Sequence, residues 1–137
     1  MSYKRSVLIN IINDLYPGVP IACGTTYDSI ILYNTPLPLV PEQTIIDAYP
    51  SYTQAHNLTI LRWERQRRLE PTDFYGLSDF PFPDDALKQQ WMTYRQALRT
   101  ITDTYPNPET DEDDNLIGVV WPTAPGGSAG GSAPQRQ

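Results

Sequence analysis

Residues 84–101 read DDALKQQWMTYRQALRTI and predict the clearest helix in the chain. Leu87, Trp91, Tyr94 and Leu98 follow at steps of four, three and four residues, which places them on one stripe of a helix. Asp84 is a favourable N-cap for its start. We therefore expect these four side chains to form the structural core of a helical module.

Two arginines flank this stripe. Arg95 and Arg99 lie beside the apolar positions, so they are candidates for polar anchoring within the module. The candidate partners for them are Asp73, Asp79 or the Trp121-Pro122 segment.

Two helices are expected upstream of this stretch. Pro41 suits a first helical position and Glu42 complements the helix dipole, so a short helix should run over residues 41–49 and end at Pro50. A longer helix is predicted over residues 53–69, with Ile60 and Trp63 on a stripe that flanks its main apolar one.

The first 40 residues have a different pattern. Apolar residues at helical spacing predict a short helix over residues 6–16. Residues 21–33 resemble a hairpin, in which Ile30 and Leu32 face one side of a strand and Ile31 and Tyr33 the other. The proline-rich residues 35–41 must be extended.

The last 36 residues are predicted to be mostly irregular. Residues 102–115 are acidic and interrupted by prolines, which indicates an exposed loop. A short strand is expected over residues 116–120, followed by an extended segment over residues 121–125. Residues 126–137 are rich in Gly, Ser and Ala and predict a flexible tail.

These elements predict an α+β fold in two modules. A helix and hairpin module is expected over residues 1–50, a helical module with extended proline-rich segments over 51–125, and the flexible tail over 126–137. The 137 residues are enough for a working core. The 14 prolines, about twice average usage, fit short elements joined by extended connections.

Composition argues against several classes of function. Ten basic and 16 acidic residues give a net charge of −6, so nucleic acid is not an expected partner. No stretch approaches the roughly 20 apolar residues of a membrane span. The single histidine, His56, and the single cysteine, Cys23, have no catalytic or zinc-binding spacing. We therefore predict no catalytic residue, no metal and no cofactor.

The dense basic cluster is the first candidate binding surface. Arg62, Arg65 and Arg68 recur at steps of three on one side of the predicted helix, with Glu64 beside them. One interpretation is an exposed helical face paired with local carboxylates. The other is a docking patch for an acidic partner surface, or a clamp for the chain's own acidic loop.

The extended segment is the second candidate binding surface. Trp121, Pro122 and Pro125 lie in a proline-stiffened strip that loses little entropy on docking into an apolar groove. The alternative is that the strip packs back on the chain's own helices. Both interpretations are open at the level of sequence.

The second half of the chain resembles the phage tail assembly chaperone family. The likeness rests on three pieces in order: RQRRL at residues 65–69 with Thr72-Asp73-Phe74; LSDFP at 77–81 with WMTYRQALR at 91–99; and VVWPTAP at 119–125. The WxxYRQALR block followed by WPxxP is the most specific part. Together the pieces span about 60 residues.

This resemblance implies a non-enzymatic protein of the phage tail module. Its implied partner is a tail fibre or baseplate protein, whose assembly it would assist or stabilise, and it could belong to a large tail assembly. A permanent structural adaptor of the virion is the alternative, and a small hydrolase is a further one. We expect it to act in the host bacterial cytoplasm during assembly, with retention in the virion tail as the other outcome.

Overall fold

The structure is a computed structural model that describes residues 1–126. These residues form four α-helices and two small antiparallel strand pairs, which confirms the α+β class. The described chain divides into two compact units, Met1–His56 and the residues from Asn57 on. The division falls within the long helix α2 (Glu42–Leu69). From residue 127 on, the predicted tail lies outside the described residues.

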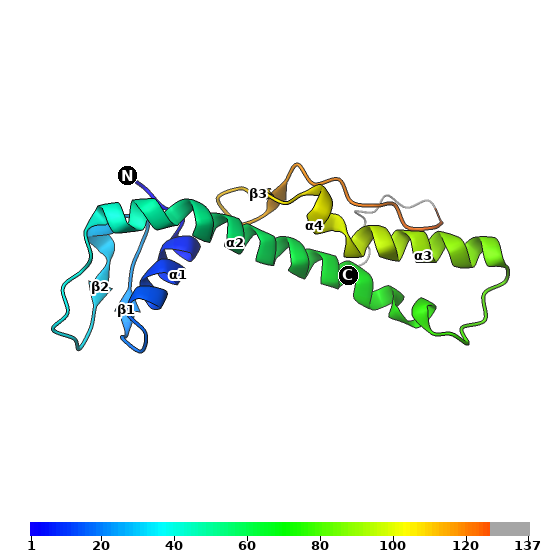
Figure 1. Cartoon of the computed structure of the whole chain (residues 1–137), viewed down its shortest axis with the longest axis horizontal. Coiled ribbons are helices and arrows are strands. Elements are labelled where there is room, and N and C mark those ends of the chain that lie inside the picture. The colour runs from blue at the N-terminus through cyan, green and yellow to red at the C-terminus, as the bar shows by residue number, and fades with distance from the viewer. Residues whose placement is uncertain (127–137) are drawn as a thin grey trace. The chain divides into compact units, whose positions relative to one another are not determined.

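The first unit begins with α1 (Arg5–Leu15) and a short hairpin (Figure 1). Strand β1 (Ile21–Ala22) pairs antiparallel with β2 (Ile31–Leu32). The 3-10 turn η1 (Tyr27–Ser29) occupies the middle of the hairpin predicted over residues 21–33, so the paired strands are short. The predicted alternation holds beyond it, since Ile30 is buried while Ile31 and Tyr33 are exposed.

Tyrosine hydroxyls connect the extended proline segment to the rest of the first unit. Val40 donates its backbone N–H to the Tyr16 hydroxyl at 2.9 Å, and that hydroxyl donates to the Pro38 carbonyl at 2.7 Å. Tyr27 donates to the Val40 carbonyl. These bonds satisfy backbone groups that an extended segment cannot pair in a sheet. The apolar core beneath is formed by Tyr3, Val7, Leu8, Ile11, Ile12, Tyr16, Cys23, Ile30 and Ile45.

The prediction that a helix ends at Pro50 is wrong. Helix α2 runs without interruption from Glu42 to Leu69 and contains Pro50 in its interior. A proline there removes one backbone hydrogen bond and crowds the preceding turn, but it does not have to end a helix. The buried Ile45 and the Tyr49 hydroxyl, which accepts the Lys4 backbone N–H at 2.8 Å, hold the turns before it in the first unit.

The second unit contains the end of α2, the 3-10 helix η2 (Glu70–Gly76), α3 (Asp85–Arg99) and α4 (Ile101–Thr104). Figure 1 shows α3 beside the end of α2. The predicted N-cap Asp84 accepts the Leu87 backbone N–H at 2.8 Å. The predicted helix ends earlier than expected, at Thr100, whose hydroxyl donates to the Gln96 carbonyl at 3.0 Å and competes with the helix backbone.

The acidic stretch expected to be a loop contains a hairpin. Strand β3 (Glu109–Thr110) pairs antiparallel with β4 (Leu116–Ile117). In the turn, the Asp111 carboxylate accepts the backbone N–H groups of Asp113 and Asn115, both at 2.9 Å. Aspartates are therefore present here because their side chains build the turn.

A buried asparagine attaches this hairpin to α2. Asn57 donates its side-chain amide to the Pro108 carbonyl at 3.0 Å and accepts the Thr110 hydroxyl at 2.9 Å. Since Asn57 is almost fully buried, these bonds satisfy polar groups that water cannot reach.

Candidate protein-docking site

The core of the second unit lies where α2 and α3 meet the C-terminal strip, residues 121–125. Leu69, Tyr94 and Leu98 are buried, and Trp121 and Ala124 pack against them. Of the four side chains predicted as core, Tyr94 and Leu98 are buried, while Leu87 and Trp91 are half-buried. The Trp91 ring stacks on Tyr75 with 4.2 Å between the ring centroids.

Arg95 is a buried anchor between α3 and η2. Its guanidinium donates to the Thr72 hydroxyl at 2.7 Å and pairs with the Asp73 carboxylate at 3.2 Å. Asp73 is one of the partners expected for it from the sequence. Thr72 in turn donates to the Leu69 carbonyl at 2.8 Å, so this network fixes the chain just after α2.

The C-terminal strip, residues 121–125, lies along the helices of its own unit (Figure 1). The Val120 backbone N–H donates to the Tyr105 hydroxyl at 2.9 Å, while the Val120 side chain remains exposed. Trp121, Pro122 and Pro125 are half-buried. The structure therefore shows the strip packed on its own helices, one of the two arrangements that the sequence left open.

Arg68 covers the strip's tryptophan. Its guanidinium carbon lies 3.9 Å from the centroid of the Trp121 ring, a close cation–π contact. The same cation lies near Tyr94. Burial raises the pKa of Tyr94 above its ordinary value, and the Arg68 charge partly opposes this.

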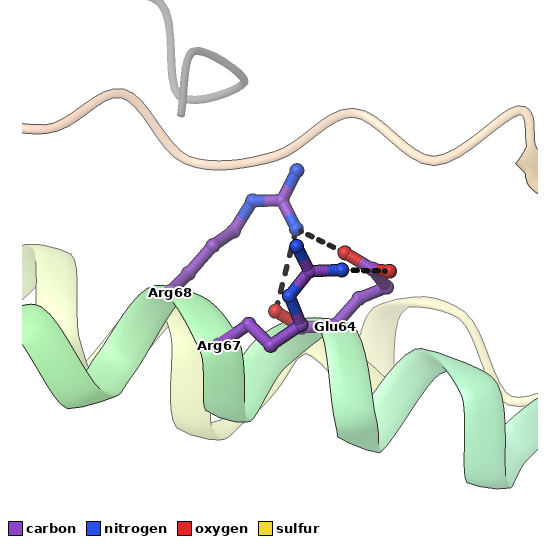
Figure 2. A network of polar contacts seen from close by, with 3 residues as sticks. All are labelled: Glu64, Arg67 and Arg68. Carbon is purple, nitrogen blue, oxygen red and sulfur yellow. Dashed lines mark hydrogen bonds and ion pairs between the residues drawn. The ribbon is translucent and has the colours of Figure 1, made fainter. Parts of the chain in front are cut away.

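Glu64 binds this arginine and its neighbour together. Its carboxylate pairs with Arg67 and with Arg68, each at 3.2 Å, and its carbonyl accepts a further bond from Arg68 at 3.3 Å (Figure 2). At the other end, the Arg67 guanidinium lies 5.6 Å from the ring of Trp63. The five side chains form a continuous series of contacts, which we call the arginine ladder: Trp63, Arg67, Glu64, Arg68 and Trp121.

The two ends of the arginine ladder differ in exposure. Trp121 is half-buried against the core, whereas Trp63 is 63% exposed. The Arg67 side chain is 43% exposed and that of Arg68 is 18% exposed. The ladder thus leads from the core of the unit to an indole and a guanidinium at the surface.

The three arginines of the predicted patch have different surroundings in the structure. Arg68 belongs to the ladder, Arg65 donates to the Arg99 carbonyl at the end of α3 at 3.2 Å, and Arg62 is exposed. Sequence reasoning placed Trp63 on a flanking stripe and missed its pairing with Arg67. The signal was present in the spacing, since Trp63 and Arg67 are four residues apart and Glu64 precedes the two arginines by three and four.

The described residues contain neither a cluster of metal ligands nor a membrane-spanning helix. Over residues 1–126 no group of three or more His, Cys, Asp or Glu side chains could hold a metal ion. Within the same range no helix is both long and apolar enough to cross a membrane.

The family model for phage tail assembly chaperone protein matches residues 58–126, half of the chain. This chain belongs to the phage tail assembly chaperone family. The matched residues include the whole arginine ladder, the Arg95 network and the C-terminal strip of this chaperone. No curated protein and no solved structure gives a significant match to the chaperone.

Proposed function

We propose that this chaperone binds a tail fibre or baseplate protein during assembly and does so without catalysis. The observation that carries the proposal is the exposed Trp63, which makes a cation–π contact with Arg67, whose guanidinium pairs with Glu64. Tryptophan and arginine are the residues most enriched at binding hot spots. A pair already ordered by its neighbours loses less conformational entropy when a partner docks.

The docking surface combines both surfaces predicted from the sequence. Arg62 and Arg65 lie on α2 near the ladder in sequence, and Arg68 joins α2 to the strip through Trp121. The strip residues Trp121, Pro122 and Pro125 are half-buried, so each can offer a partner only part of its surface.

The charges of the surface indicate the chemistry of the partner. Four arginines of residues 62–68 are offset by the single carboxylate of Glu64, in a chain whose overall charge is −6. An apolar partner surface that carries carboxylates would complement both the indole and the arginines. Such charges should mainly raise the association rate and orient the partner.

The thiol of Cys23 is unsuited to act as a nucleophile. Cys23 is buried, and burial raises the pKa of its thiol, although the charge of Arg5 opposes the shift. A reactive cysteine needs the opposite shift, toward the thiolate.

Co-expression tests binding directly. Each tail fibre and baseplate gene of the phage that encodes the chaperone is expressed with the tagged full chain, and complexes are purified at about 0.15 M salt. We expect at least one of these proteins to co-purify with the wild type and to be recovered poorly with Trp63→Ala. If none of them co-purifies, the proposed function is wrong.

Mass spectrometry of purified virions separates an assembly factor from a permanent adaptor. An assembly factor is needed for infectious particles but is lost from them, so deletion of the gene should abolish tails while wild-type virions lack the protein. A fixed number of copies in every virion would instead support the adaptor.

A further inference from the structure

The stretch between α2 and α3 gathers aromatic rings that the arginine ladder does not use. Tyr75 is central: its ring centroid lies 4.3 Å from that of Phe74, 4.9 Å from Phe80 and 5.7 Å from Phe82. Phe80 also contacts Phe74 and Phe82, at 5.4 Å and 4.6 Å. The rings therefore form one cluster at the surface of the second unit.

The described chain covers this cluster only in part. Phe74 is 47% exposed and Leu77 is 58% exposed, while Tyr75, Phe80 and Phe82 are half-buried. A contiguous group of exposed large apolar side chains is unusual on a small protein and is typical of a binding surface.

The charged residues of the segment that carries the rings are all acidic. Residues 70–87 contain five carboxylates and no lysine or arginine. Arg95 pairs with Asp73. Four further carboxylates lie on exposed residues, Glu70, Asp79, Asp84 and Asp85, and of these Asp84 also caps α3. We call the rings, Leu77 and these four carboxylates the acidic aromatic surface.

We propose that the acidic aromatic surface binds a basic, apolar segment of another protein, a second site distinct from the arginine ladder. An uncharged apolar partner would offer these carboxylates no opposite charge, and an acidic one would be repelled. Lysine and arginine side chains satisfy both parts of the surface, because their apolar stems pack on rings while their charged ends reach carboxylates. The chaperone would then contact two regions of opposite charge, an acidic one through the ladder and a basic one here.

Designed peptides of about 12 residues test this with the full chain. One alternates Lys or Arg with Leu or Trp, and its control carries Glu at every basic position. Fluorescence anisotropy measures the binding of each labelled peptide. We expect the basic peptide to bind, with an affinity that falls as salt rises, and the acidic peptide not to bind.

Matched variants locate the site. Leu77→Ser and Phe74→Ser should each weaken binding of the basic peptide about tenfold, as expected for a hot spot. Asp79→Asn/Asp85→Asn should weaken it and reduce its salt dependence. The control is Ile117→Ser, since Ile117 is as exposed as Phe74, at 47%, but lies on β4. Leu77 is 58% exposed, so circular dichroism should show Leu77→Ser folded.

Three outcomes would overturn the inference. The first is equal binding of the two peptides. The second is wild-type affinity for the basic peptide in a folded Leu77→Ser variant. The third is self-association of the chain that Leu77→Ser abolishes, because the occupant of the surface would then be a second copy. None depends on a tail protein. If this second binding site is wrong, the proposed function is unaffected, since the co-expression experiment tests it separately.

Discussion

The Arg68 guanidinium covers the Trp121 ring at 3.9 Å and thereby joins the basic cluster of α2 to the C-terminal strip. Both features were candidate binding surfaces in the sequence, separated by more than 50 residues. In the folded chaperone the two surfaces are in contact with each other. Substitutions here must therefore be tested for stability before any loss of binding is interpreted.

Trp121→Ala should destabilise the second unit by about 2 to 3 kcal/mol. The expected loss is smaller than for a fully buried tryptophan, because the Trp121 ring is only half-buried. The loss includes the cation–π contact with Arg68. Urea denaturation followed by far-UV circular dichroism measures it. Trp63→Ala is the matched control and should cost less than about 1 kcal/mol, since Trp63 is 63% exposed. Equal losses would show that the strip is not packed.

Thr72→Val should destabilise the protein by about 1 to 3 kcal/mol, because it leaves the buried Arg95 guanidinium without its shortest hydrogen bond. Asp73→Asn should cost less than about 1 kcal/mol, since the Asp73 side chain is 60% exposed and water screens the pair. The free energies of unfolding of both variants, measured side by side, check the ranking. A larger loss for Asp73→Asn would contradict it.

Residues 84–101 show how much of the second unit could be predicted from the sequence. The stripe and the N-cap Asp84 follow from local spacing, whereas Asp73 was only one of three alternative partners for the arginines and the folded chain selects it for Arg95. The pairing of Arg68 with Trp121 could not be predicted, because it depends on the path of the chain between them. The hairpin after Pro108 was missed for a similar reason, since the buried Asn57 of α2 positions it.

Pro50 shows the limit of a local rule. Proline usually ends a helix, but contacts of Ile45 and Tyr49 hold the preceding turns in place, and these contacts are not local.

The continuity of α2 can be tested at Gln54. In an uninterrupted helix its N–H donates to the Pro50 carbonyl, so its amide should be protected from hydrogen exchange. Pro50→Ala should raise stability by about 1 to 3 kcal/mol, because it restores the bond to the Ile46 carbonyl. Pro36→Ala, in the extended segment, should bring no such gain. Rapid exchange at Gln54, with no gain from Pro50→Ala, would show two separate helices.

The first unit should lose stability in alkali through Tyr3. Burial and the hydrogen bond to Glu42 raise the pKa of Tyr3 from 10.0 to about 12. Because the folded pKa is the higher one, this stabilisation is complete below pH 10 and declines as the pH rises toward 12. Thermal melts across that range should show a shallower decline for Tyr3→Phe. Tyr33→Phe, at an exposed position, should decline like the wild type, and an equally steep decline in Tyr3→Phe would exclude this cause.

The affinity of the purified chaperone for a tail fibre or baseplate protein tests the central proposal most directly. Surface-immobilised full chain is titrated with each purified tail protein, in parallel with Trp63→Ala and with Leu37→Ala, which changes an exposed apolar residue of the first unit. We predict binding of at least one tail protein, about tenfold weaker or more for Trp63→Ala and unchanged for Leu37→Ala. Wild-type affinity in Trp63→Ala would exclude the arginine ladder as the docking site, and no binding by any tail protein would contradict the proposed function.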